Sequence, residues 1–207
     1  MRLCTISALL SALGATGLCG QLSNQQIQAT VTNSPWARPV AVEGRTVIVR
    51  WESARPVIDA CAQGGMEVYL FSCASKLLYL SGLQNKFTGI VEHFHVLSIS
   101  NYPRMPVLGP GPHPPEHSAA ANEELAEMGT RLRETTTLSA GAGATVKPVD
   151  VVVLPAGDAL LVLLFFERAE PLTSQERKLK FESTYGSIHI STSFSVGEMQ
   201  GRGKPAL

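Results

Sequence analysis

His93 and His95 are the residues whose types and spacing point most directly to chemistry in this sequence. A spacing of two on a strand places both imidazoles on one side, as metal sites on strands require. His113 and His117 follow in a loop and could supply further ligands. No acidic residue joins them at a recognised spacing, and apolar residues continue the same face. A metal site at His93 and His95 is therefore an alternative hypothesis beside an ordinary structural role.

The N-terminal segment indicates whether the chain is exported, and export determines the redox environment of the cysteines. It has a basic start at Arg2, an apolar run over Leu3–Leu18 and small residues near its end, which is the layout of a secretory signal peptide. The run is short for a membrane span, and polar sequence follows it. A signal peptide over residues 1–20 is therefore preferred to a buried helix or a membrane anchor.

The cleavage point has two candidates. Cleavage after Gly20 leaves Gln21 first, and cleavage after Gly17 fits comparably. Lipid attachment at Cys19 is disfavoured, because Leu18 stands where bacterial lipoprotein signals have a small side chain.

Removal of the signal peptide leaves Cys61 and Cys73. Two cysteines in an exported chain are more often paired than free, because the compartment is oxidising. Closing this loop would contribute about 3 kcal/mol in the chain-entropy model. The sequence thus predicts a Cys61–Cys73 disulfide, with two buried thiols as the alternative.

Recognised catalytic motifs are missing from the sequence. There is no G-x-S-x-G, S-x-x-K or H-E-x-x-H. The G-x-G at Gly141 and Gly143 precedes a predicted strand rather than a helix, so it is not a phosphate-binding loop. The expectation is a protein without enzymatic activity and without a cofactor.

Length and charge limit the remaining classes. The 207 residues suit one domain, predicted over residues 21–196. Hydrophobic residues make up 44% and charged residues 16%, with a formal net charge of zero. Such a chain has no field that would attract nucleic acid.

The segment from Val149 to Arg168 organises the predicted fold. Two apolar runs, Val149–Leu154 and Ala159–Phe166, flank Pro155-Ala156-Gly157-Asp158. Pro and Gly break a helix here and suit a turn, so the pattern predicts a β-hairpin. The second run lacks polar alternation, which indicates a central strand covered on both faces.

Further strands follow from composition and alternation. In Ile188–Val196 five residues face inward (Ile188, Ile190, Thr192, Phe194 and Val196), while His189 and the serines face solvent. The remaining predicted strands are an edge strand around Ile27–Thr32, then Arg45–Trp51, Met66–Cys73, Lys76–Leu83, Thr88–Asn101, Thr135–Leu138 and Lys178–Glu182.

Two helices are predicted in the connections. A short one has Ser53 as its cap and Pro56 in its first turn, and ends at Gly64. A longer one spans Ser118–Arg133 and carries an apolar stripe on one face. The proline-rich stretch 103–115 is expected to be an extended loop, and residues 197–207 a disordered tail.

These elements favour a mainly β antiparallel sandwich, immunoglobulin-like or related; an α+β fold with helices on one face of a sheet is the alternative. The region from Thr135 resembles the last strands of exported bacterial immunoglobulin-like domains, with a threonine-rich strand, a glycine turn and a hydrophobic hairpin. The resemblance covers about a third of the chain and implies no activity.

The functional expectation is a periplasmic or secreted, non-catalytic binding or scaffolding protein of the bacterial envelope. Its partner would be another protein or an envelope component, and the mature chain would have no transmembrane span. Assembly by strand addition through the polar segment Gln21–Val42 is a further possibility.

Overall fold

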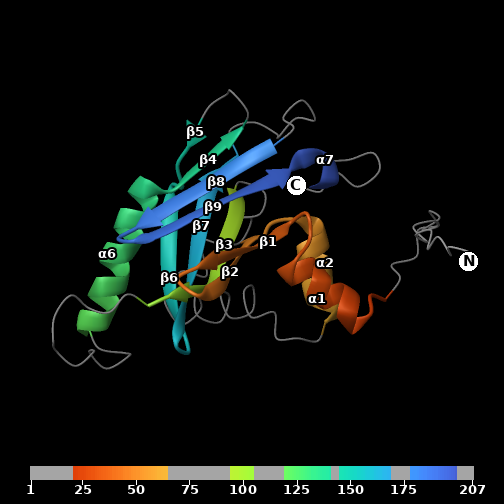
Figure 1. Cartoon of the computed structure of the whole chain (residues 1–207), viewed down its shortest axis with the longest axis horizontal. Coiled ribbons are helices and arrows are strands. Elements are labelled where there is room, and N and C mark those ends of the chain that lie inside the picture. The colour runs from red at the N-terminus through yellow and green to blue at the C-terminus, as the bar shows by residue number, and fades with distance from the viewer. Residues whose placement is uncertain (1–20, 65–93, 105–118, 141–144, 169–177, 200–207) are drawn as a thin grey trace, which may run out of the picture.

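The computed structural model describes residues 21–64, 94–104, 119–140, 145–168 and 178–199 (Figure 1). The described part is mainly β and consists of two antiparallel sheets with helices at their sides. This confirms the predicted fold class. The two sheets face each other around one core, and their strands cross rather than run parallel (Figure 1).

The larger sheet holds the predicted hairpin. Its strand order is β1 (Ala37–Val42), β2 (Arg45–Trp51), β3 (Phe94–Pro103), β7 (Ala159–Glu167) and β6 (Asp150–Ala156). β6 and β7 pair from Ala156 with Ala159, and Gly157 takes a positive φ of 66° in the turn. β7 lies between β3 and β6, and every residue from Ala159 to Phe166 is buried. Both the hairpin and the central position of its second strand are confirmed.

The smaller sheet buries one face. Its order is β5 (Thr145–Val146), β4 (Thr137–Ala140), β8 (Lys178–Tyr185) and β9 (Ile188–Ser195). In β9, Ile188, Ile190 and Phe194 are buried while His189 and Ser191 are exposed, as the alternation predicted.

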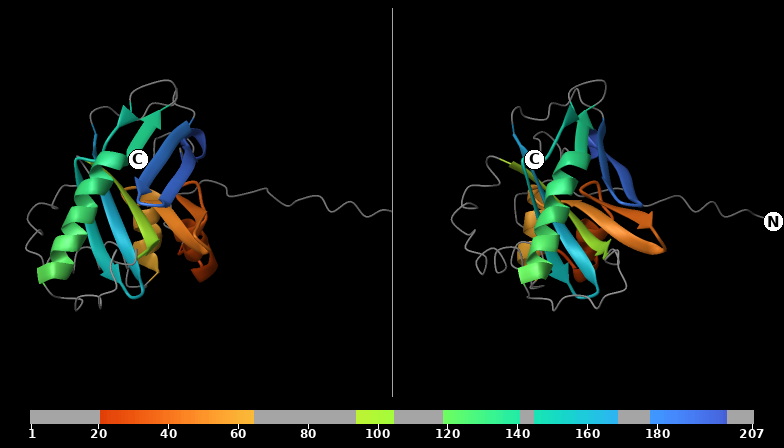
Figure 2. Two further views of the ribbon diagram at one scale, coloured as in Figure 1. Left: turned by 60° about the vertical axis from the view of Figure 1, so that its left-hand side comes forward. Right: turned by 90° about the vertical axis from the view of Figure 1, so that its left-hand side faces the viewer.

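One helix closes the side between the sheets. α6 (Ala119–Thr135) corresponds to the predicted long helix and packs on β6 and β8 (Figure 2). Met128 and Leu132 enter the core, and Gly129 lies so close to β6 that an added Cβ would be 3.1 Å from the carbonyl oxygen of Val151. α6 thus covers the edge of the larger sheet, which would otherwise present unpaired backbone groups.

The predicted edge strand around Ile27–Thr32 is wrong, because this segment is helix α1 (Asn24–Thr32). Ser23 and Gln26 form a capping box that fixes the first turn. Ile27 and Val31 are four apart and share the buried side of a helix. The alternation of Ile27, Ala29 and Val31 with polar residues had suggested a period of two, but Ala29 is exposed and only the pair four apart is buried.

α2 (Arg55–Gln63) confirms the predicted short helix with a different cap. Ala54 is the N-cap and makes no side-chain hydrogen bond. The Ser53 hydroxyl instead accepts a hydrogen bond from the N–H of Val96 at 3.1 Å. α1 and α2 contact each other on the side of the molecule away from α6 (Figure 1).

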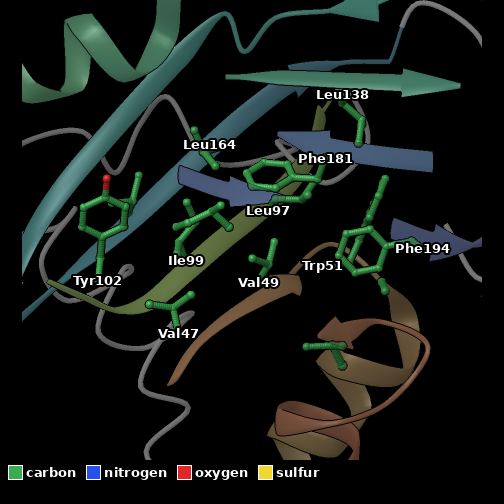
Figure 3. Packing of buried hydrophobic residues seen from close by; sticks show 14 of the residues in the cluster. Val47, Val49, Trp51, Leu97, Ile99, Tyr102, Leu138, Leu164, Phe181 and Phe194 are labelled. Carbon is green, nitrogen blue, oxygen red and sulfur yellow. The ribbon is translucent and has the colours of Figure 1, made fainter. Parts of the chain in front are cut away.

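A single large core joins both sheets. Figure 3 shows Val47, Val49 and Trp51 of β2 together with Leu97 and Ile99 of β3, opposite Phe181 of β8 and Phe194 of β9. Trp51 and Phe194 meet edge to face with ring centroids 5.5 Å apart. A second cluster, on the opposite face of the larger sheet, contains Val96, Leu161, Leu163 and Phe165, with Phe94, Val152 and Leu154 packed against it.

The C-terminal end of the described chain is helical. Val196–Met199 form α7, and both Val196 and Met199 are buried, where the sequence predicted the start of a disordered tail. Several other predictions lie outside the described residues: the strands Met66–Cys73 and Lys76–Leu83, most of the loop 103–115, and the signal peptide.

Candidate functional site

The densest group of buried polar side chains lies where α1, β2 and β3 meet. Arg50 Nε and Glu52 Oε1 are 2.8 Å apart, with their side chains 10% and 1% exposed. Ser98, which is fully buried, donates its hydroxyl to the same carboxylate oxygen. Arg50 also donates through Nη1 to the carbonyl oxygen of Val31 at 3.3 Å. We call Arg50, Glu52 and Ser98 the buried polar triad.

Strand register explains how the triad forms. Arg50 and Ser98 are partners in the antiparallel pairing of β2 with β3, so their side chains share one face of the sheet. Val31 belongs to the last turn of α1, whose final carbonyls lack helical partners. The Arg50 guanidinium therefore completes the end of α1 while it neutralises Glu52.

The arrangement of the triad suits structural support better than catalysis. Glu52 Oε2 is buried and has no hydrogen-bond partner in the part of the chain that the structure describes. A carboxylate that is almost fully buried and already paired with Arg50 is poorly placed to exchange a proton with a substrate. Its clear effect is to join an N-terminal helix to two strands.

Cys61 lies in α2 and is buried. Burial raises the pKa of its thiol; nearby Arg50 opposes this shift and Glu52 adds to it. The thiol form is therefore favoured over the nucleophilic thiolate. Cys73 lies outside the described residues, so the Cys61–Cys73 disulfide stays a prediction.

His95 lies on β3 opposite Phe166 and is 6% exposed. Its ring approaches that of Trp51 edge-on, with centroids 5.4 Å apart. Among the described residues neither ring nitrogen has a hydrogen-bond partner, and the same is true of the indole N–H of Trp51. Burial, with a smaller contribution from Arg168, lowers the pKa of His95 from 6.5 to about 4. The imidazole is therefore neutral at neutral pH.

The predicted metal site cannot be assembled from the described residues alone. His93, His113 and His117 lie outside them. Within the described ranges no three His, Cys, Asp or Glu side chains come together in a group that could hold a metal ion. Metal binding at His93 and His95 stays a prediction.

The sequence reasoning missed the buried polar triad. Arg50 and Glu52 flank Trp51 at the end of an apolar strand. Because residues two apart on a strand share one face, this spacing could have predicted an ion pair between them. Ser98 had no such signal, because its place opposite Arg50 depends on the register between two strands that are far apart in the chain; Ser98 and Glu52 are separated by 46 positions.

Among the described helices, none is both long and apolar enough to cross a membrane. No protein-family model, no curated protein and no solved structure matches this chain.

Proposed function

We propose that this protein is an exported, non-catalytic binding or scaffolding protein of the bacterial envelope, located in the periplasm or secreted. The observation that carries the proposal is where the chemically capable side chains lie. Glu52, Ser98 and His95 are 1%, 0% and 6% exposed, and Cys61 is buried with them. These four side chains, which could act as base, nucleophile or ligand, thus lie inside the described part of the fold.

Buried hydrogen bonds between elements support a rigid body. The buried polar triad joins α1, β2 and β3, and the hydroxyls of Thr136 and Ser183 lie 2.8 Å apart in the interior where α6 runs into the smaller sheet. Buried polar groups that are bonded across elements fix one arrangement of those elements. A rigid body with solvated outer surfaces is suited to holding or linking partners.

Strand addition through Gln21–Val42 receives no support from the fold. α1 occupies Asn24–Thr32 of this segment and buries Ile27 and Val31. β1 already pairs with β2 of the same chain. The segment would have to leave the core before it could complete another subunit's sheet.

Export is tested by expressing the full chain in a Gram-negative bacterium and separating periplasm from cytoplasm. The expected result is a shortened chain in the periplasm. The matched control is Leu9→Arg with Leu10→Arg, which interrupts the apolar run and is expected to leave the full-length chain in the cytoplasm. If the unaltered chain also stays full-length in the cytoplasm, the export proposal is wrong.

Binding is tested with the protein purified from the periplasm and labelled with a fluorophore. Isolated cell envelopes are titrated into it and sedimented, and the expected result is saturable co-sedimentation that unlabelled protein competes away. An unrelated exported protein of similar size is the control. Protein that stays in the supernatant at every envelope concentration contradicts an envelope partner.

A metal-binding protein or metal-dependent enzyme that uses His93 and His95 is the second candidate. It is favoured by the two buried nitrogens of His95, which have no hydrogen-bond partner within the described ranges, because a neutral imidazole is the form that ligates metals. Elemental analysis of the purified protein tests it. Stoichiometric zinc or copper that is lost in the double variant His93→Ala, His95→Ala and kept in His189→Ala would favour this candidate over the first.

A further inference from the structure

Leu22 and Ser23, which follow one of the two predicted cleavage points, contact the fold. The N–H of Leu22 donates to Oε1 of Gln63 on α2 at 2.7 Å, and the Leu22 side chain packs at the edge of the core. Ser23 then caps α1: its hydroxyl accepts from the N–H of Gln26 at 3.2 Å, and its own N–H donates to Gln26 Oε1 at 2.8 Å. Gln21 stands just before these contacts and is exposed.

Cleavage after Gly20 would make Gln21 the N-terminal residue, so the inference rests on the proposed export. We infer that Gln21 is then converted to pyroglutamate. Its free α-amino nitrogen attacks Cδ of its own side-chain amide, and the new C–N bond closes a five-membered lactam. The Cδ–NH₂ bond breaks, and the amide nitrogen leaves as ammonia with the proton that the amine gives up. No oxidant, reductant or co-reactant takes part.

The position of Gln21 allows this reaction. Ring closure needs a free amine and a side chain that can fold back onto it, and the exposure of Gln21 meets both needs once the preceding bond is cut. The reaction should leave the fold unaffected, because the hydrogen bond from Leu22 to Gln63 involves neither the amine nor the side chain of Gln21.

The electrostatics of α1 favour the cyclised end. The N-terminus of a helix carries partial positive charge, so a nearby ammonium group is destabilising. α1 has no acidic residue in its first turn to offset such a charge. Cyclisation removes the α-ammonium charge, as other modifications that block the N-terminus do.

The test uses the full chain, expressed with its own N-terminal segment and purified from the periplasm of a Gram-negative bacterium. Mass spectrometry of the intact protein and its N-terminal peptide is expected to give residues 21–207 less one ammonia. Stepwise N-terminal degradation is expected to release no residue. A chain that begins with unmodified Gln21 or with Leu18 overturns the modification while export stands. A full-length chain in the cytoplasm overturns the export proposal instead.

Gln21→Ala is the matched variant and is expected to begin with a free alanine. At pH 6 its Tm should be lower than that of the pyroglutamyl protein by about 1–3 °C, because its terminal ammonium stands two residues before the Ser23 cap of α1. At pH 10 an α-amino group, whose ordinary pKa is about 8, is uncharged, and the difference should disappear. A difference that persists unchanged at pH 10 would overturn the electrostatic role of the modification.

Discussion

The hairpins β6–β7 and β8–β9 both turn through two residues, and the first of these is a glycine with positive φ, 66° at Gly157 and 58° at Gly186. They differ in how many faces they bury. β7 is buried at each position from Ala159 to Phe166, whereas β9 alternates between buried and exposed residues. The larger sheet therefore has apolar clusters on both faces, and the smaller sheet has one apolar and one solvated face.

This difference determines what polar side chains do in each sheet. Arg50 and Glu52 of the larger sheet are cut off from water and must satisfy each other. Lys180 and Glu182 of the smaller sheet form a 2.9 Å ion pair with side chains 53% and 37% exposed, so water competes for both charges. Breaking an ion pair is therefore expected to change the free energy of unfolding more in the larger sheet than in the smaller one.

The largest expected effect comes from breaking the buried ion pair. Glu52→Gln leaves the Arg50 charge buried without a counter-charge and should cost about 3–5 kcal/mol of unfolding free energy. Glu182→Gln removes the matching charge from the exposed pair and should cost about 0–1 kcal/mol. Urea unfolding monitored by tryptophan fluorescence measures both. Equal losses in the two variants would contradict the contrast between the sheets.

The next prediction compares adjacent residues on the two strands. Leu163 and Leu164 point to opposite faces of β7 and are 3% and 0% exposed, so Leu→Ala at either position should cost about 2–5 kcal/mol. On β9, Phe194→Ala should cost about 3–5 kcal/mol, whereas Ser193→Ala should stay within ~0.5 kcal/mol. Denaturant midpoints of the four variants test this. A neutral Leu163→Ala would mean that the second cluster is not a packed core.

The periodicity of apolar side chains allowed the two sheets to be predicted from the sequence. The unbroken apolar run Ala159–Phe166 predicted a strand buried on both faces. The alternation of apolar and polar residues in Ile188–Val196 predicted a strand with one solvent-exposed face. Periodicity failed at Ile27–Thr32, because two apolar residues four apart satisfy a helix and a strand pattern equally well. The capping box at Ser23 and Gln26 was the local signal that could have decided for a helix.

The candidate site was less predictable, for a physical reason. The charges of Arg50 and Glu52 are visible in the sequence, but their burial and the partnership with Ser98 arise only when β2 pairs with β3. The predicted partners His93 and Cys73 lie outside the described residues, so the metal site and the disulfide stay predictions.

A smaller effect concerns the histidines of the two sheets. The pKa of buried His95 is lowered from 6.5 to about 4, so the unfolded chain binds a proton over this range that the folded chain does not. The stability contributed by neutral His95 is therefore complete above about pH 6.5 and is lost as the pH falls toward 4, by at most about 3 kcal/mol. Unfolding free energies measured between pH 4 and 7 test this.

His95→Phe keeps a ring beside Trp51 and should flatten the dependence of stability on pH in that range. His189→Gln, at an exposed position of β9, is the control and should retain the dependence because His95 is still present. If the two variants show the same slope, His95 is not the group responsible.

The smallest effect compares two helical glycines, one beside each sheet. Alanine in place of glycine favours a helix by up to about 1 kcal/mol. At Gly197 of α7 an added Cβ meets nothing within 4 Å, so Gly197→Ala should stabilise the protein by roughly 0.5 kcal/mol.

At Gly129 of α6 the Cβ would lie 3.1 Å from the carbonyl oxygen of Val151, which the pairing of β6 with β7 holds in place. Moving α6 away from β6 should outweigh the helical gain, so Gly129→Ala should destabilise by about 1 kcal/mol. The two changes in Tm should therefore have opposite signs, and a stabilising Gly129→Ala would mean that α6 does not pack tightly on the sheet edge.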